Sequence, residues 1–200
     1  MLAMIEKAAL KIVDFISDYI SMDDELAEVY KYGVEISIST VLNMLITMII
    51  ALILGDPICG VIFLVCLGVI RSYCGGYHAD SYFKCNCMMI ILFSTAYCVS
   101  RLLVHFNILE FRIMASVLLI SFIPVYAFSP VKNKYKTLSE KKAKKCRIIS
   151  LILYILVSFI GLLLITIAPL YGSITIVTLV QISVMILVEI YRQRRNNNEA

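Results

Sequence analysis

The residue types that could do covalent chemistry gather in one short polar stretch, residues 71–85, between two apolar blocks. This stretch contains His78, one of two histidines, and the thiols Cys74 and Cys85, with Cys87 just beyond. The thiolate is the reactive form of cysteine, and a nearby imidazole can accept the thiol proton. A cysteine and a histidine on one polar loop therefore predict a thiol nucleophile with its base.

Spacing limits which cysteine can serve as the nucleophile. His78 and Cys85 are seven residues apart, or about 10.5 Å along an unbroken helix, which is too far for a direct contact. We therefore expect the chain to bend at Gly75-Gly76 and a new helix to begin at Asp80 or Ser81, both of which are good N-caps. Cys85 would then lie in the first or second turn, where the helix dipole favours a thiolate.

Other interpretations of the same residues stay open. Cys87 points about 200° away from Cys85 on one helix, so the two cannot both be poised for reaction. Cys74 lies on the far side of the glycine pair and is a weaker candidate. Cys85 and Cys87 could also be small apolar fillers, with His78 bonded to backbone. The spacing lacks the close cysteine pairs of common zinc sites, so no metal is expected.

The elements that must position this stretch are membrane spans. The 200 residues are 61% apolar and have a mean hydropathy of +0.92, which excludes an ordinary soluble domain. Helices are favoured because lipid offers the backbone no hydrogen-bond partners. The predicted fold is all-α, one polytopic domain over residues 1–200 with a six-span bundle over 36–191. The spans are expected at 36–54, 58–70, 87–104, 113–128, 148–168 and 172–191.

Turn signals separate several of these spans. The tripeptide Gly55-Asp56-Pro57 predicts a tight turn, and residues 168–172 predict another. The second span is short, and we expect it either to recruit part of residues 72–77 or to leave the bilayer locally thin.

The basic residues determine the expected orientation. With the N-terminus inside, sixteen of the 18 Lys and Arg residues fall on the cytoplasmic side, and only Arg101 and Arg112 fall outside. We therefore predict a multi-pass protein of the cell membrane whose termini and catalytic loop are cytoplasmic. The same side carries a basic loop at 129–147.

Residues 1–30 predict an amphipathic helix followed by an acidic turn. Two interpretations are open: a helix lying in the cytoplasmic membrane interface near a docked peptide, or a helix packed on the bundle. Apolar residues that recur every three to four positions support the helix: Ile5, Ala9, Ile12, Ile16 and Tyr19.

One combination of motifs resembles a known family. The run Arg71…Gly75-Gly76-x-His78-x₆-Cys85 follows two apolar blocks and is similar to the AgrB family of accessory gene regulator proteins. The chain length, the six spans and the sequence Ser-Pro-Val-Lys-Asn-Lys at 129–134 are similar as well, so the resemblance covers nearly the whole chain. Cys74 differs from the small residue expected before the glycine pair.

The resemblance implies a membrane-embedded cysteine endopeptidase that processes a quorum-sensing propeptide. His78 and Cys85 would be the catalytic pair, with support from Arg71, Gly75-Gly76 and Asp80. Cys85 would attack the bond before an acidic C-terminal tail, and a thiol or hydroxyl of the propeptide would close a thiolactone or lactone. No cofactor is expected.

The expected partners follow from charge and from small residues. A basic face would attract an acidic tail, and candidate contacts are Lys132, Lys134 and Lys136. Small residues in the last two spans permit close helix packing, which suggests a homodimer. A nucleic-acid role is not expected, because the basic run lies against a membrane and has only Tyr135 interleaved.

Two other functions compete with the protease. A small peptide transporter would need polar residues along its spans. The chain offers few: Asn43 and Glu35 in or near the first span, and Gln181 and Glu189 in the last. A non-catalytic membrane sensor subunit would tolerate Cys85→Ser.

Overall fold

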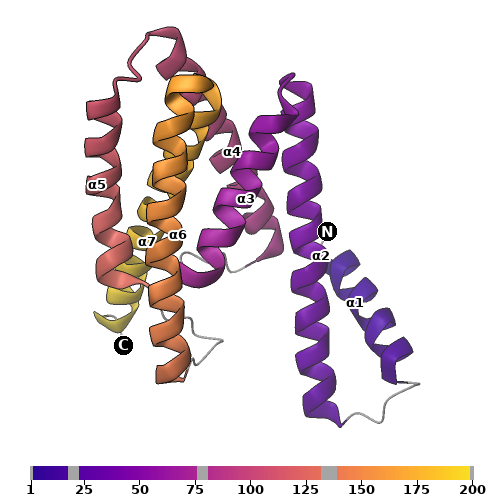
Figure 1. Ribbon diagram of the computed structural model, residues 1–200. Helices are drawn as coiled ribbons and strands as arrows, with labels where there is room; N and C mark the ends of the chain where they lie inside the picture. Colours follow the sequence, from indigo (N-terminus) through magenta and orange to yellow (C-terminus); the bar gives the residue numbers. More distant parts are fainter. Residues whose placement is uncertain (1, 18–22, 76–80, 132–138, 199–200) are drawn as a thin grey trace.

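The computed structural model describes residues 2–17, 23–75, 81–131 and 139–198. Within these residues the chain forms seven α-helices and no strand (Figure 1). The helices are α1 (Leu2–Ser17), α2 (Asp24–Ile53), α3 (Pro57–Cys74), α4 (Tyr82–His105), α5 (Phe111–Phe128), α6 (Glu140–Ile167) and α7 (Pro169–Asn198).

Six of these helices, α2 to α7, are long and apolar enough to cross a membrane. Each covers its predicted apolar block to within one residue, and α3 extends to Cys74 as the short second block required. Large apolar side chains face outward on their flanks, among them Leu119 and Ile120 on α5 and Ile152 and Phe159 on α6. Outward apolar faces suit a lipid surround, so the all-α polytopic prediction is confirmed.

The predicted turn between the first two spans is present. Gly55 has a φ of +79°, which an L side chain rarely adopts, and Asp56 caps α3 by accepting a hydrogen bond from the Cys59 amide at 3.4 Å. The second predicted turn is much shorter than residues 168–172. Only Ala168 separates α6 from α7, because Pro169 can occupy the first turn of a helix without losing a hydrogen bond.

Helix α7 is the centre of the bundle and packs against α3, α4, α5 and α6. Its contact with α6 depends on two glycines. A Cβ added to Gly172 would lie 2.8 Å from the Gly161 carbonyl oxygen and would also meet the Ile165 amide. The small residues that suggested a homodimer therefore pack two helices of one chain together.

Several polar side chains inside the bundle form hydrogen bonds between helices. The Ser121 and Tyr154 hydroxyls are 2.6 Å apart, and Ser183 donates to the Ser121 carbonyl. Gln181 donates from α7 to the Leu92 carbonyl of α4 at 2.9 Å. These bonds determine how the helices are positioned against one another. Apolar side chains alone would do so poorly, because their contacts with lipid are nearly as favourable as their contacts with protein.

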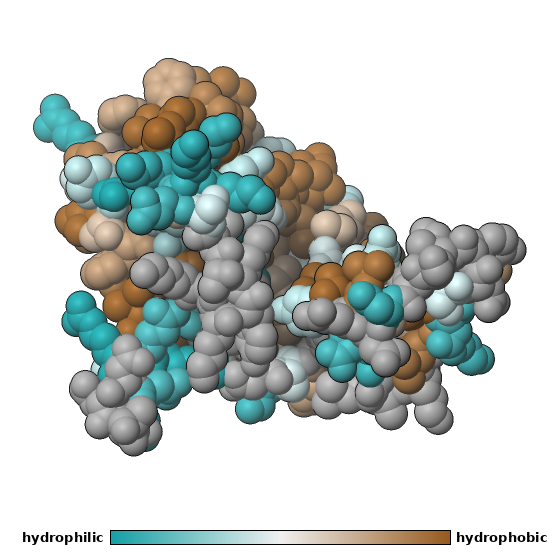
Figure 2. Space-filling view, turned by 90° about the horizontal axis from the view of Figure 1, so that it is seen from below, coloured by the Kyte–Doolittle hydropathy of each residue, from teal (hydrophilic) through white to brown (hydrophobic). Residues whose placement is uncertain are grey.

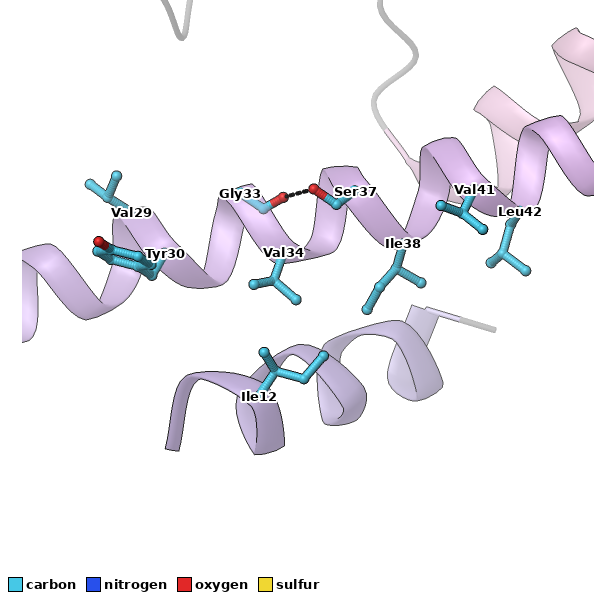
Figure 3. A pocket seen from close by; sticks show the side chains of 9 residues that line it. All are labelled: Ile12, Val29, Tyr30, Gly33, Val34, Ser37, Ile38, Val41 and Leu42. Atoms are coloured by element: carbon cyan, nitrogen blue, oxygen red, sulfur yellow. Dashed lines mark hydrogen bonds between the residues drawn. The ribbon is translucent and has the colours of Figure 1, made fainter. Parts of the chain in front are cut away.

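The N-terminal helix packs beside α2. Ala9 and Val13 of α1 are buried, and an apolar groove of about 650 Å³ lies between the two helices, where Ile12 faces Val34 and Ile38 (Figure 3). The predicted amphipathic helix is confirmed, and of its two interpretations the packing of α1 on the bundle is present.

The residues expected as an acidic turn instead open α2. Asp23 caps this helix by accepting from the Leu26 amide at 2.9 Å, and Asp24, Glu25 and Glu28 lie in its first turns. Negative charge at the start of a helix is stabilised by the helix dipole, which explains why the helix begins here.

The predicted basic loop at 129–147 is also partly helical. Helix α6 begins at Glu140, so Lys141 to Arg147 lie on its first turns. Arg147 donates to the Tyr126 carbonyl of α5 at 3.1 Å and stacks on the Tyr126 ring, which joins the two helices at this end of the bundle.

The two ends of the bundle differ in charge. The chain ends α3, begins α4 and α6, and ends α7 toward the same end of the bundle; in Figure 1 the start of α6 is lowest, and the end of α3 and the start of α4 lie at about mid-height. Hydrophilic side chains are visible across this end, with apolar surfaces beside them (Figure 2). Arg101, near the end of α4, and Arg112, near the start of α5, lie at the other end of the bundle. The helix arrangement is therefore compatible with the charge asymmetry from which the orientation was predicted.

Candidate active site

Cys85 lies in the first turn of α4, as predicted. Ser81 is the N-cap: its hydroxyl accepts a hydrogen bond from the Lys84 amide at 3.3 Å, and its carbonyl accepts from the Cys85 amide at 3.0 Å. The Cys85 side chain is partly exposed. A partly exposed thiol at the positive end of a helix has the access and the electrostatic surroundings that a nucleophile requires.

Three residues of the predicted site, Gly76, His78 and Asp80, lie outside the described residues. The contact between His78 and Cys85 therefore stays a prediction. The helix begins at Ser81, which places His78 three residues before the cap in the chain.

A side chain from another helix meets the Cys85 sulfur. The Asn43 amide nitrogen of α2 donates to the Cys85 Sγ atom at 3.7 Å, and the Asn43 side chain is buried. Ser39 and Thr47, one turn before and one turn after Asn43, are buried on the same face of α2. The Thr47 hydroxyl bonds to the Asn43 carbonyl of its own helix, whereas the Asn43 side chain reaches across to α4.

Burial distinguishes the three candidate cysteines. Cys74 is fully buried, and its thiol lies 3.2 Å from the Gly75 carbonyl oxygen. Cys87 is partly exposed like Cys85, but it is two residues further along α4 and so points to another side of the helix. Among the described cysteines, Cys85 combines exposure with a place in the first turn of a helix and a polar neighbour.

Arg71 lies next to this thiol. It is half-buried in the last turn of α3, and its guanidinium is close enough to Cys85 and Cys74 for its charge to act on both sulfur atoms. A positive charge beside a thiol stabilises the thiolate. The structure thus brings Arg71 and Cys85 together, as the sequence motif suggested.

Gly75 connects the site to the basic segment. It ends α3 with a φ of +72°, and its amide donates to the Arg71 carbonyl at 3.0 Å. The Val131 amide donates to the Cys74 carbonyl, also at 3.0 Å, and a Cβ on Gly75 would lie 3.0 Å from the Val131 carbonyl oxygen. Gly75 and Val131, the last described residues before segments 76–80 and 132–138, are therefore neighbours in space.

This junction bears on the basic candidates Lys132, Lys134 and Lys136, which all lie outside the described residues. Lys132 directly follows Val131 in the chain, and Gly76 directly follows Gly75.

Sequence reasoning did not assign Asn43 or Val131 to the site. The spacing of Ser39, Asn43 and Thr47, one helical turn apart in an apolar span, is a signal that one polar face of the first span meets another helix. Val131 carries no comparable signal, because its contact is made through the backbone.

The fold and the site define a class: a polytopic all-helical membrane protein with a partly exposed cysteine at the start of a helix, next to an arginine and a buried amide. The family model described as Accessory gene regulator B matches residues 9–188. The chain belongs to this family, AgrB, and family membership gives it an accessory gene regulator role.

Two relatives in Clostridium perfringens agree with this assignment. One, from strain SM101 (Type A), is named as AgrB-like, and the other, from strain 13 (Type A), is named as AgrB-like protein 2. Each is 28% identical over 148 residues, which cover 71% of this chain and 68% of the relative. No solved structure matches the chain.

Proposed function

We propose that this protein is a membrane-embedded cysteine endopeptidase that removes the C-terminal tail from a quorum-sensing propeptide. The observation that carries the proposal is the surroundings of Cys85: a partly exposed thiol in the first turn of α4, with Arg71 and the Asn43 amide beside it. Helix dipole and guanidinium both favour the thiolate, which is the attacking species.

The reaction begins with attack of the Cys85 sulfur on the carbonyl carbon of the bond before the tail. His78 accepts the thiol proton, and the carbonyl electrons move onto oxygen to give a tetrahedral intermediate. When the intermediate collapses, the carbon–nitrogen bond breaks and the imidazolium protonates the leaving amine. The products are the free tail and a thioester between Cys85 and the truncated propeptide.

Ring closure follows by exchange. A thiol or hydroxyl within the propeptide attacks the thioester carbon, the carbon–sulfur bond to Cys85 breaks, and the Cys85 thiol is regenerated. Conversion of an amide into a thioester is unfavourable in free energy, so departure of the tail is needed to draw the first step forward. Thiolactone formation is then nearly neutral in free energy and requires mainly that water be excluded.

The basic segment is proposed to hold the acidic tail. Val131 bonds to the Cys74 backbone beside the site, and Lys132, Lys134 and Lys136 follow it directly in the chain. Attraction between this segment and a tail of acidic residues would bring the scissile bond toward Cys85. The site, the basic segment and both termini are proposed to face the cytoplasm, and the working unit is proposed to be a homodimer.

The test is co-expression with a propeptide that carries a tagged acidic tail. We expect wild-type protein to release the tail, and Cys85→Ala and His78→Ala to release none. Cys85→Ser should lose at least about a hundredfold, because a serine hydroxyl next to the same base is a far weaker nucleophile than a thiolate. Intact Cys85→Ala that releases the tail at the wild-type rate would refute the proposal.

Cys87→Ala is the matched control, because this partly exposed thiol lies on the same helix. It should release the tail at the wild-type rate. Acid quenching of the wild-type reaction should also trap a protein–propeptide adduct that hydroxylamine cleaves, and the adduct should be absent from Cys85→Ala.

A further inference from the structure

We propose that Asn43 is a further catalytic residue, whose side-chain amide stabilises the negative charge first on the Cys85 sulfur and then on the oxygen of the tetrahedral intermediate. The stabilisation of the oxyanion rests on the proposed function, whereas the stabilisation of the sulfur does not. The contact between the amide and the sulfur is a feature of the resting protein.

The geometry places the donor at the reacting atom. Asn43 Nδ2 lies 3.7 Å from Cys85 Sγ, and only 8% of the Asn43 side chain is exposed. In the intermediate, the oxyanion is two bonds from Sγ. A donor that contacts the sulfur therefore needs only a small rotation to reach that oxygen.

The energetic argument depends on the weakness of sulfur as an acceptor. A neutral thiol accepts a hydrogen bond poorly, so the amide gains little from Cys85 in the resting state. A thiolate or an oxyanion accepts much more strongly, and the gain is larger where water is excluded. An interaction that is weak before the reaction and strong during it lowers the barrier rather than tightening substrate binding.

A second buried amide shows the contrast with a structural role. Gln181 Nε2 donates to the Leu92 carbonyl at 2.9 Å and to the Thr95 hydroxyl at 3.0 Å, both of them oxygen acceptors that hold α7 to α4. The Asn43 donor instead meets a thiol. The carbonyl oxygen of both amides, Asn43 Oδ1 and Gln181 Oε1, is buried with no hydrogen-bond partner among the described residues, so the two side chains differ only in the acceptor that the NH₂ group meets. Oxygen acceptors stabilise the contact of α7 with α4, whereas the acceptor of Asn43 is the sulfur of the proposed nucleophile.

The charged group that faces Cys85 from α3 is Arg71, and Lys84 precedes Cys85 on α4. Asn43 adds a directed hydrogen bond from the side of α2. Arg71 and Lys84 stay in place in every variant below, and each replacement of Asn43 is neutral, so a change in the thiol on replacing Asn43 reports the loss of the amide.

The experiment compares wild type, Asn43→Leu, Asn43→Ala and the control Thr47→Val in the full-length membrane-inserted protein. Leucine keeps the branched outline of asparagine and removes the donor, and alanine removes the donor without adding bulk or charge. Thr47 is buried one turn away, and its hydroxyl bonds only to its own helix in the described structure, at 2.9 Å from the Asn43 carbonyl. Two rates are measured: alkylation of Cys85 against pH, followed by mass spectrometry of the peptide that contains it, and tail release at saturating propeptide.

We expect the alkylation midpoint of Asn43→Leu and Asn43→Ala to move to higher pH by at least half a unit. Their rate of tail release should fall by roughly a hundredfold, the usual effect of losing one oxyanion donor, with KM within about twofold of the wild-type value. Thr47→Val should match wild type in both assays. Asn43→Ala decides the result if Asn43→Leu is absent from the membrane.

An unmoved alkylation midpoint in the Asn43 variants would overturn the proposal, as would tail release within twofold of wild type. The alkylation assay uses no propeptide, so it judges the contact separately from the protease. A moved midpoint in a protein whose wild type releases no tail would keep the Asn43–Cys85 contact and reject the proposed function.

Discussion

The bundle around α7 and the edge where α2 meets α4 are built differently. Of the apolar window of α7, 56% is buried inside the protein, against 22% for α2. Around α7, hydrogen bonds such as that between the Ser121 and Tyr154 hydroxyls join neighbouring helices, and glycines bring the helices close. At the α2–α4 edge, a buried amide meets a partly exposed thiol. This difference indicates that the bundle around α7 holds the helices in place, while the α2–α4 edge leaves a hydrogen-bond donor available for a substrate. We call these two regions the packed side and the loose side.

The largest effect should come from filling the tightest contact of the packed side. In Gly172→Val, the added carbons would meet the Ile165 amide and the Gly161 carbonyl, both of them backbone that cannot move aside. We expect a loss of about 3 kcal/mol or more, enough to deplete the protein from the membrane. Membrane abundance and the midpoint of thermal unfolding in detergent measure this.

Gly68→Ala is the control for that variant, since a Cβ there meets nothing within 4 Å. It should be as abundant as wild type. If Gly172→Val accumulated and melted like Gly68→Ala, the contrast between a tight and a loose side of the bundle would be wrong.

Gly75→Ala should harm activity more than stability. The side chain would force an L residue into a backbone region that costs about 1–3 kcal/mol, and it would press on the Val131 carbonyl 3.0 Å away. Because α3 ends here, relief of the strain would shift the segments that continue at 76 and 132. We expect tail release to fall at least about tenfold, the equivalent of 1.4 kcal/mol, while most of the protein stays in the membrane.

A milder test removes one polar pair from the packed side. Tyr154→Phe deletes the hydroxyl that lies 2.6 Å from the Ser121 hydroxyl, while Ser121 keeps its hydrogen bond to the Leu118 carbonyl at 3.1 Å. We expect a loss of about 0.5–1.5 kcal/mol in unfolding free energy, the usual effect of one hydrogen bond, and an unchanged rate of tail release per folded molecule. A slower rate in fully folded Tyr154→Phe would mean that the two sides are not independent.

The smallest effect should come from the basic segment. Replacing Lys132, Lys134 and Lys136 with Gln should slow release of an acidic tail, and solvent-screened charge pairs of ~0.2 kcal/mol each predict roughly a threefold change. The difference should disappear at high salt and with a neutralised tail. An equal loss with the neutral tail would argue against charge recognition.

Sequence alone predicts the six spans well, because apolar blocks of bilayer length are a strong and local signal. It also predicts a helix cap at Asp80 or Ser81, of which Ser81 is the one observed, and Cys85 in the first or second turn behind the cap. The junction at Ala168 was not predicted, since a turn signal with Pro and Gly does not distinguish a loop from Pro169 at the start of a helix and Gly172 at a helix contact.

The parts of the site that come from distant segments could not be predicted. The contact of Asn43 with Cys85 depends on how α2 packs on α4, and spacing along one helix does not give that. The hydrogen bond between Val131 and Cys74 joins two backbone groups, so the identity of the side chains does not predict it.

That backbone bond has a consequence for synthesis of the protein. The chain between Cys74 and Val131 contains α4 and α5, so the two ends of a complete transmembrane hairpin are tied at one point. During translation, the reactive thiol emerges from the ribosome long before Val131 does. The residues that surround the thiol, Asn43, Arg71 and Ser81, all precede it in the chain, whereas the bond of Val131 to Cys74 can form only after both arms of the hairpin have been synthesised. A nascent chain stalled within α5 would therefore lack this contact at the end of α3.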